Sequence, residues 1–136
     1  MGSVEMLKEP AVQIMAMWIR TDKSFCSEED KLRDFIDEII RRLDLTVVIP
    51  PLGVKLPIMN FSDQYGKRPK PPSDVGISLL TLIAESHIGL HTWPVFGLAF
   101  LEVCSCKFFD EAVVEDVVKR HFPNYQISKR GLIFEV

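Results

Sequence analysis

Reactive side chains gather in a window of about 20 residues in the second half of the chain. The window holds two of the three histidines (His87 and His91), two of the three cysteines (Cys104 and Cys106) and, at its edge, Ser86. Thiols, imidazoles and a hydroxyl at such short spacing are the groups used for metal binding, for nucleophilic attack and for proton transfer.

The residue types admit three interpretations. His-x3-His with Cys-x-Cys provides zinc ligands, although both pairs fall on expected strands rather than on a helix or a zinc knuckle. Ser86, His91 and a cysteine could instead perform nucleophilic or acid–base catalysis. In the third interpretation the cysteines pack as small hydrophobic groups and the histidines close turns, which is a purely structural role. The residue types alone favour this structural role.

The whole chain limits the classes of protein that can hold these residues. Its 136 residues and 15.5 kDa predict one domain over 1–136. Its net charge of −3 provides no excess of positive charge for binding nucleic acid. No apolar run approaches the roughly 18 residues that span a bilayer, so no membrane partner is expected. The N-terminus lacks the pattern of a signal peptide, and the odd cysteine count argues against a disulfide scaffold. A cytoplasmic protein is therefore expected.

Apolar periodicity predicts the elements that must position the reactive window. The run 11–19 suits a buried strand, and apolar residues at helical spacing predict a helix over 28–43. Segment 50–75 holds six of the nine prolines and predicts a long irregular connection. Further strands are expected at 45–49 (stopped by Pro50 and Pro51), 76–84, 88–93, 98–106, 125–128 and 131–136, with a second helix after Asp110. This order favours an α+β fold, a two-layer α/β sandwich with a mainly antiparallel sheet.

A longer motif surrounds the reactive residues. Positions 84–94 read A-E-S-H-I-G-L-H-T-W-P, and Ser105-Cys106 ends the following strand. The segment resembles the prokaryotic S-adenosylmethionine decarboxylases, whose pattern is E-S-H-x-x-x-H-T-x-P followed by a strand ending in T-C. Gly76-Ile77-Ser78 likewise resembles the G-V-S-G strand start of that family. The resemblance is specific over about 76–106 and implies an S-adenosylmethionine decarboxylase-like fold.

The resemblance implies a self-processing enzyme of polyamine biosynthesis. In that family the serine hydroxyl, here Ser86, attacks the carbonyl of the preceding residue, here Glu85, and the chain divides into 1–85 and 86–136. Ser86 becomes a pyruvoyl group that forms a Schiff base with the α-amine of a small-molecule substrate and serves as the electron sink during loss of carbon dioxide. No pyridoxal phosphate and no metal are implied. His91 and Ser78 would assist processing, and Cys106 would protonate the product carbanion.

Strand geometry predicts how these residues meet. A rise of about 3.3 Å per residue places Ser78 roughly 26 Å from Ser86 on one extended strand, too far for a single site. In a meander with turns at 85–87 and 94–97, residue 91 pairs near 81 and residue 106 near 85. Ser86 and Cys106 then lie together, away from Ser78 and His91. If all four serve one reaction, the sites are shared across a two-fold homodimer, as the resemblance also implies.

The positions that recognise substrate in the resembled family differ here. The family motif continues H-T-x-P-E, with the glutamate holding ribose hydroxyls, but this chain has Val95. Losing that acceptor costs about 2–4 kcal/mol in ribose binding. A family stretch that supplies an adenine-stacking aromatic is replaced by segment 50–75, which leaves Trp93 as a stacking surface.

This difference favours a changed substrate, L-arginine or L-ornithine. Glu102 shares the strand face of Cys106 and could receive a guanidinium or ammonium group together with Asp63 or Asp74. A structural role for the Glu102 carboxylate is the equal alternative. S-adenosylmethionine as the substrate, with supply of an aminopropyl donor for spermidine, and a non-catalytic relative that regulates an active partner remain the alternative functions.

Overall fold

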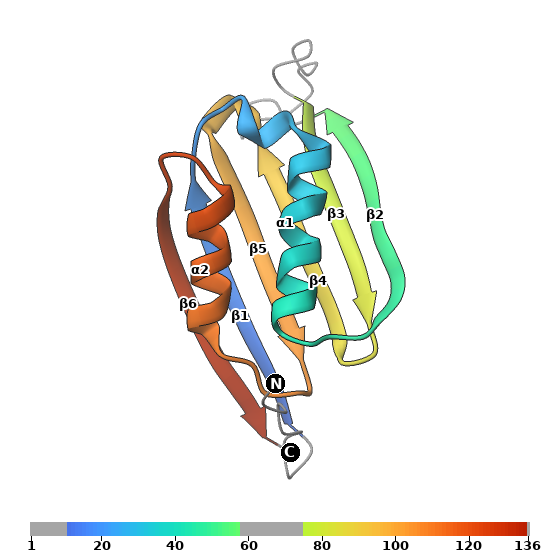
Figure 1. The fold of residues 1–136 in the computed structure, drawn as a ribbon. Coiled ribbons are helices and arrows are strands. Elements are labelled where there is room, and N and C mark those ends of the chain that lie inside the picture. The colour runs from blue at the N-terminus through green and yellow to red at the C-terminus, as the bar shows by residue number, and fades with distance from the viewer. Residues whose placement is uncertain (1–10, 58–74, 136) are drawn as a thin grey trace, which may run out of the picture.

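Six strands form one antiparallel sheet, and both long helices lie against the same face of it (Figure 1). The computed structural model describes residues 11–57 and 75–135. The sheet order is β2-β3-β4-β5-β1-β6. The strands are β1 (Ala11–Arg20), β2 (Val47–Pro57), β3 (Val75–Ile83), β4 (Ser86–Trp93), β5 (Leu98–Ser105) and β6 (Gln126–Glu135). The helices are α1 (Glu29–Arg42), α2 (Glu111–His121) and the short 3-10 turns η1 (Phe25–Ser27) and η4 (Pro94–Phe96). The predicted two-layer α+β sandwich is confirmed.

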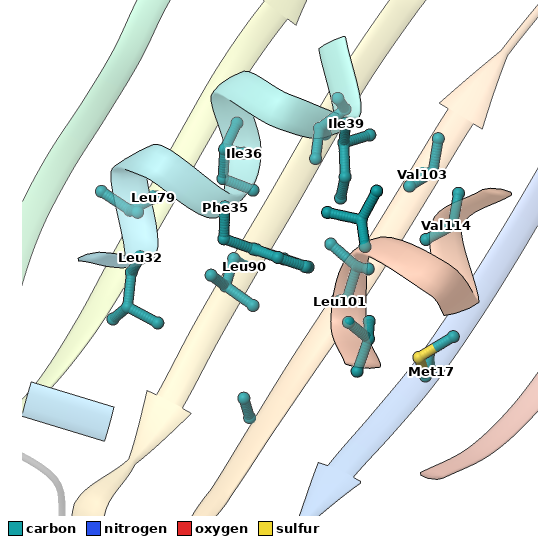
Figure 2. Close-up of a cluster of buried hydrophobic side chains, with 14 of the residues drawn as sticks. Met17, Leu32, Phe35, Ile36, Ile39, Leu79, Leu90, Leu101, Val103 and Val114 are labelled. Carbon is teal, nitrogen blue, oxygen red and sulfur yellow. The ribbon is translucent and has the colours of Figure 1, made fainter. Parts of the chain in front are cut away.

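The core lies between the helices and one face of the sheet. On α1 the apolar residues recur at three- and four-residue spacing, so Leu32, Phe35 and Ile39 all point into the sheet and are fully buried. Figure 2 shows these side chains packed against residues of β3, β4 and β5 and against Val114 of α2. Burying each such side chain contributes about 1.5–3 kcal/mol. Asp110 accepts a hydrogen bond from the Ala112 amide and caps α2, as the sequence predicts.

Within residues 11–57 and 75–135, no helix covers the opposite face, here called the outer face. Side chains alternate between the two faces of a strand, so the neighbours of the core residues point outward. Many of these outward residues are apolar and more than a third exposed: Trp18, Leu52, Val54, Leu80, Leu82, Leu132 and Phe134. The outer face therefore carries exposed apolar side chains on β1, β2, β3 and β6.

Three strands differ from the sequence predictions. β2 continues through Pro50 and Pro51 to Pro57, because β2 is an edge strand where missing ladder donors are tolerated, and its pairing with β3 shifts twice nearby. β4 begins at Ser86 rather than at residue 88. β6 is one strand through Gly131, where an added Cβ would collide with the carboxylate of Glu111.

Part of the expected 50–75 connection is thus strand. Residues 58–74, and with them Asp63 and Asp74, lie outside the described part of the chain.

An ion pair joins the two helices and makes stability depend on pH. The Glu38 carboxylate of α1 lies 2.8 Å from His121 Nε2 of α2, and the Arg120 guanidinium is 3.4 Å away. The hydrogen bond from His121 and the nearby cationic Arg120 lower the pKa of Glu38. Because the folded pKa is below the unfolded value, this stabilisation is present above about pH 4.3 and is lost as pH falls through the folded pKa.

Glu38→Gln should therefore lower the free energy of unfolding at pH 7 and reduce its loss between about pH 5 and pH 3. Urea denaturation of both proteins across this range measures the difference. Parallel pH curves for the wild type and Glu38→Gln would show that the pair contributes nothing.

Candidate active site

The turn between β3 and β4 brings the ends of three strands together. Glu85 lies in this turn and Ser86 is the first residue of β4. Ser86 pairs with Ser105 of β5, and the Cys106 amide donates a hydrogen bond of 2.9 Å to the Glu85 carbonyl oxygen. The predicted proximity of residue 106 to residue 85 is confirmed at the level of the backbone.

Polar side chains surround the Ser86 hydroxyl. Its Oγ lies 3.3 Å from His87 Nδ1 and 3.5 Å from Cys104 Sγ. The other ring nitrogen of His87 lies 2.8 Å from Glu102 Oε1. These four residues, Ser86, His87, Glu102 and Cys104, are called the serine group below. His87 and Glu102 are only partly buried, with side chains 34% and 40% exposed, so a small molecule can reach them.

The backbone is unusual at Ser86. Its φ angle is 155°, a value that residues with a Cβ rarely adopt. The other non-glycine residues with positive φ in the described chain are Asp44 and Asn124, whose short polar side chains tolerate such conformations. Serine is not one of the residue types that commonly adopt a positive φ angle. The Glu85–Ser86 junction therefore holds local strain next to a hydroxyl group and a hydrogen-bonded carbonyl.

A second polar pair lies farther along the same strands. Ser78 pairs with His91 across β3 and β4, and Ser78 Oγ is 2.8 Å from His91 Nδ1. The predicted pairing of residue 91 near 81 is wrong, because the connecting turn is Ala84–Glu85 rather than 85–87. This shift of register joins Ser78 directly to His91.

Aromatic rings flank the Ser78–His91 pair. The ring of Trp93 lies 6.4 Å from that of His91 and 5.5 Å from that of Trp18, and Trp18 lies 4.9 Å from Phe100. All four rings belong to neighbouring strands β4, β5 and β1. Because Trp18 is 45% exposed, the cluster offers a flat apolar surface to a ligand or a partner.

The serine group and the Ser78–His91 pair are separate within one subunit. Four residues of β4 lie between Ser86 and His91, so the two are five strand steps or about 16 Å apart. Gly89 lies between them, and a Cβ added there would meet only His91 Nε2, at 3.9 Å. Apart from His91, the described chain brings no atom outside Gly89 and its two chain neighbours within 4 Å of that Cβ position, which leaves room for a ligand next to Gly89.

The three cysteines have different surroundings. Burial, with a smaller contribution from Asp22, raises the pKa of the Cys26 thiol to about 11, which removes this residue as a nucleophile. Cys104 is buried beside Ser86, and Cys106 is partly exposed just after β5. Within residues 11–57 and 75–135, no three His, Cys, Asp or Glu side chains lie together as metal ligands.

The remaining expected site residues have clear positions. Trp93 ends β4, and the half-buried Val95 lies in η4, two residues after Trp93 and at the opposite end of β4 from Ser86. Glu102 faces His87 rather than solvent alone. The sequence interpretation gave His87 and Cys104 no part in decarboxylase chemistry. Their signal was available, since alternation along two paired strands puts both on the face of Glu102.

Comparison with solved structures identifies the class of fold. The adenosylmethionine decarboxylase from Aquifex aeolicus superposes with a TM-score of 0.63, covering 93% of this chain and 91% of that chain at 21% identity. The helices and sheet described above are thus those of a decarboxylase fold. In the described residues, no helix is both long and apolar enough to cross a membrane.

Comparison of sequences identifies the family. Residues 12–132 match the family model described as S-adenosylmethionine decarboxylase. The S-adenosylmethionine decarboxylase proenzyme of Archaeoglobus fulgidus is 27% identical over 106 residues, which are 78% of this chain and 78% of that protein. The proenzyme of the same name from Acidithiobacillus ferrooxidans is 31% identical over 94 residues, 69% of this chain and 58% of that protein.

An arginine decarboxylase proenzyme from Hyperthermus butylicus is also similar, with 29% identity over 79 residues, 58% of this chain and 45% of that protein. The chain belongs to the S-adenosylmethionine decarboxylase family. It is accordingly a decarboxylase of the pyruvoyl type.

Proposed function

We propose that this chain cleaves itself between Glu85 and Ser86 and then decarboxylates an amino acid substrate at the new end of β4. The observation that carries the proposal is the strained Glu85–Ser86 junction, where a serine hydroxyl lies beside a hydrogen-bonded carbonyl. Cleavage there would give fragments 1–85 and 86–136.

The residues at this junction suit a pyruvoyl group made from Ser86. The group would sit at the start of β4, between the partly exposed His87 and the thiols of the β5 end. A pyruvoyl group withdraws electrons from an α-amino acid as carbon dioxide leaves. Cys106 would donate the proton that the product carbon then needs, because its backbone is hydrogen-bonded to the junction and its side chain is not fully buried.

The substrate we propose is L-arginine or L-ornithine. Val95 cannot accept hydrogen bonds from a ribose, whereas Glu102 is a partly exposed carboxylate that contacts His87, the neighbour of Ser86. Only its Oε1 engages His87, so Oε2 can accept from a guanidinium or ammonium group. The name of the Hyperthermus butylicus relative is consistent with this choice.

S-adenosylmethionine is the second candidate substrate. The aromatic cluster of Trp18, Trp93, Phe100 and His91 favours it, because an adenine ring stacks well on such a surface. The names of the Archaeoglobus and Acidithiobacillus relatives point the same way. Either reaction would belong to polyamine biosynthesis, and the cytoplasmic location remains a prediction.

Release of labelled carbon dioxide from arginine, ornithine and S-adenosylmethionine, measured side by side, tests the reaction and the substrate. We expect the two basic amino acids to be preferred. Val95→Glu should raise the ratio of kcat/KM for S-adenosylmethionine to that for arginine by about tenfold or more, since a hydrogen-bond acceptor for the ribose is restored. Val95→Leu is the matched control and should leave the ratio unchanged. Preference of the wild type for S-adenosylmethionine would contradict the substrate proposal, and no release from any substrate would contradict the reaction.

We further propose a two-fold homodimer formed through the outer face. Its exposed apolar side chains form the kind of surface that a soluble protein covers in an assembly. Pairing two outer faces can bring the serine group of one subunit to the Ser78–His91 pair of the other, although these lie about 16 Å apart within a subunit. Each dimer would then hold two shared sites.

A further inference from the structure

In the serine group a hydroxyl nucleophile contacts an imidazole, and the imidazole contacts a carboxylate. Ser86 Oγ lies 3.3 Å from His87 Nδ1, and His87 Nε2 lies 2.8 Å from Glu102 Oε1. We propose that His87 is the base that activates Ser86 for chain cleavage and that Glu102 is the positioning residue that orients His87. The proposal rests on the self-cleavage proposed above and assigns its first step to residues of one subunit.

The carboxylate determines which nitrogen of His87 carries the proton. An ionised Glu102 can only accept hydrogen bonds, so in neutral His87 the proton resides on Nε2. Nδ1 is then an acceptor, and it is the nitrogen that faces the Ser86 hydroxyl. In this structure the Ser86 hydroxyl donates to Cys104 Sγ at 3.5 Å, a weak acceptor, and rotation about the C–O bond turns the same hydrogen towards His87 Nδ1. At 3.3 Å the contact is long, as catalytic hydrogen bonds commonly are before the reacting geometry forms.

The attacked carbonyl is also prepared for reaction. The Cys106 amide donates to the Glu85 carbonyl oxygen at 2.9 Å, within the range of an oxyanion-stabilising donor. The φ of 155° at Ser86 adds strain that the breaking of the peptide bond releases. The nucleophile, the base, the carboxylate that orients the base, and the donor to the developing oxyanion all come from the β3–β4 turn, β4 and the end of β5.

The step can be written with all atoms conserved. Ser86 Oγ forms a bond to the Glu85 carbonyl carbon while its proton moves to His87 Nδ1. The C–N bond of the peptide then breaks, and the same proton passes from His87 to the departing Ser86 nitrogen. The product is an ester between Glu85 and Ser86 with a free Ser86 amine, and no oxidant, reductant or added reactant is needed. Glu102 stays ionised and stabilises the imidazolium that forms in between.

His91 is not placed to perform this first step within a subunit. It is hydrogen-bonded to Ser78 and lies about 16 Å along β4 from Ser86. Ester formation should therefore proceed in a single subunit, before or without dimer formation.

The test follows the cleavage of freshly synthesised chain into its two fragments on denaturing gels, in the absence of substrate. His87→Asn keeps a hydrogen-bond acceptor near Ser86 but cannot take up a proton, so cleavage should slow by about 100-fold or more. Glu102→Gln keeps an acceptor for His87 without the charge and should slow cleavage by about tenfold, and Glu102→Leu should slow it further. The matched control is His121→Asn, which breaks the other His–Glu pair of 2.8 Å and should leave the cleavage rate unchanged.

Two further readouts separate a base from a structural residue. Free imidazole should restore cleavage to His87→Ala, because it can occupy the vacated space and accept the proton. Hydroxylamine, which cuts esters, should fragment a stalled chain only if the ester has formed, so His87→Ala without imidazole should stay resistant.

The outcomes also separate this proposal from the one on which it rests. Wild-type chain that cleaves, together with His87→Asn that cleaves at the rate of His121→Asn, would overturn the role of His87 and leave self-cleavage intact. Slow cleavage of His87→Ala without rescue by imidazole would make His87 structural and overturn the proposal as well. Wild-type chain that never cleaves would overturn self-cleavage itself.

Discussion

Ser86→Ala will leave the chain uncut and without decarboxylase activity. Alanine has no hydroxyl to attack the Glu85 carbonyl, so neither the ester nor the pyruvoyl group can form. A denaturing gel should show one band near 15.5 kDa for Ser86→Ala, and two fragments that meet at residue 86 for the wild type. Mass spectrometry of the wild-type fragment 86–136 should find a blocked N-terminus. The expected loss of activity is complete, because no other residue can supply the electron sink.

Two comparisons make this result specific. Ser24→Ala removes an exposed hydroxyl that makes no capping hydrogen bond, and it should process normally. Circular dichroism of Ser86→Ala should match that of the wild type, since Ser86 contributes no core contact. A wild-type chain that runs as one band, indistinguishable from Ser86→Ala, would contradict the proposed function.

Mixing two inactive variants should restore activity if the sites are shared. In a dimer of one Ser86→Ala subunit and one His91→Ala subunit, one site carries both changes and the other site carries neither. Random pairing makes about half of the dimers mixed, so about a quarter of wild-type activity should return. Activity of the co-expressed variants, assayed before mixed dimers are separated from the two parental dimers, measures this recovery. The effect is large because each variant alone should be nearly inactive.

The control for this experiment combines Ser86 with a second residue at the same end of the strands in the same subunit. Cys106 follows β5 at the Glu85–Ser86 junction of its own subunit. Mixing Ser86→Ala with Cys106→Ala should give no recovery, since both sites of a mixed dimer are then damaged. Recovery in this control, or none with His91→Ala, would argue against sites divided as proposed.

Local patterns predicted most elements because each carries its own signal. The α1 stripe, the Asp110 cap and the turn after Pro94 depend on neighbouring residues, and all three are found. The predicted end of the strand at Pro50 and Pro51 was wrong. Prolines interrupt a central strand, but β2 lies at the edge of the sheet, and only the sheet order shows this. Likewise, Gly131 suggested a break between two strands. The structure shows that a side chain at this position would collide with Glu111 of α2, a residue distant in sequence.

The candidate site was predictable in composition but not in register. The motif predicts Ser86, His91 and Cys106 as site residues. The position of the β3–β4 turn sets the register of the two strands and so decides which side chains are in contact. A turn displaced by one or two residues changes the partner of His91 from residue 81 to Ser78. Strand alternation places Glu102 on the same face as Cys104 and Cys106, but only the register between β4 and β5 shows that its carboxylate meets His87.

The sheet order has a consequence for a chain that has been cut at residue 86. Fragment 1–85 would contribute β1, β2 and β3, and fragment 86–136 would contribute β4, β5 and β6. Because β1 lies between β5 and β6, and β3 pairs with β4, each fragment is hydrogen-bonded to the other along several strands. The uncut chain reaches this interlocked sheet as a single molecule, but the two separated fragments would have to find each other again. Cutting thus turns a concentration-independent folding equilibrium into a concentration-dependent one, so the protein assembles most readily before it becomes an enzyme.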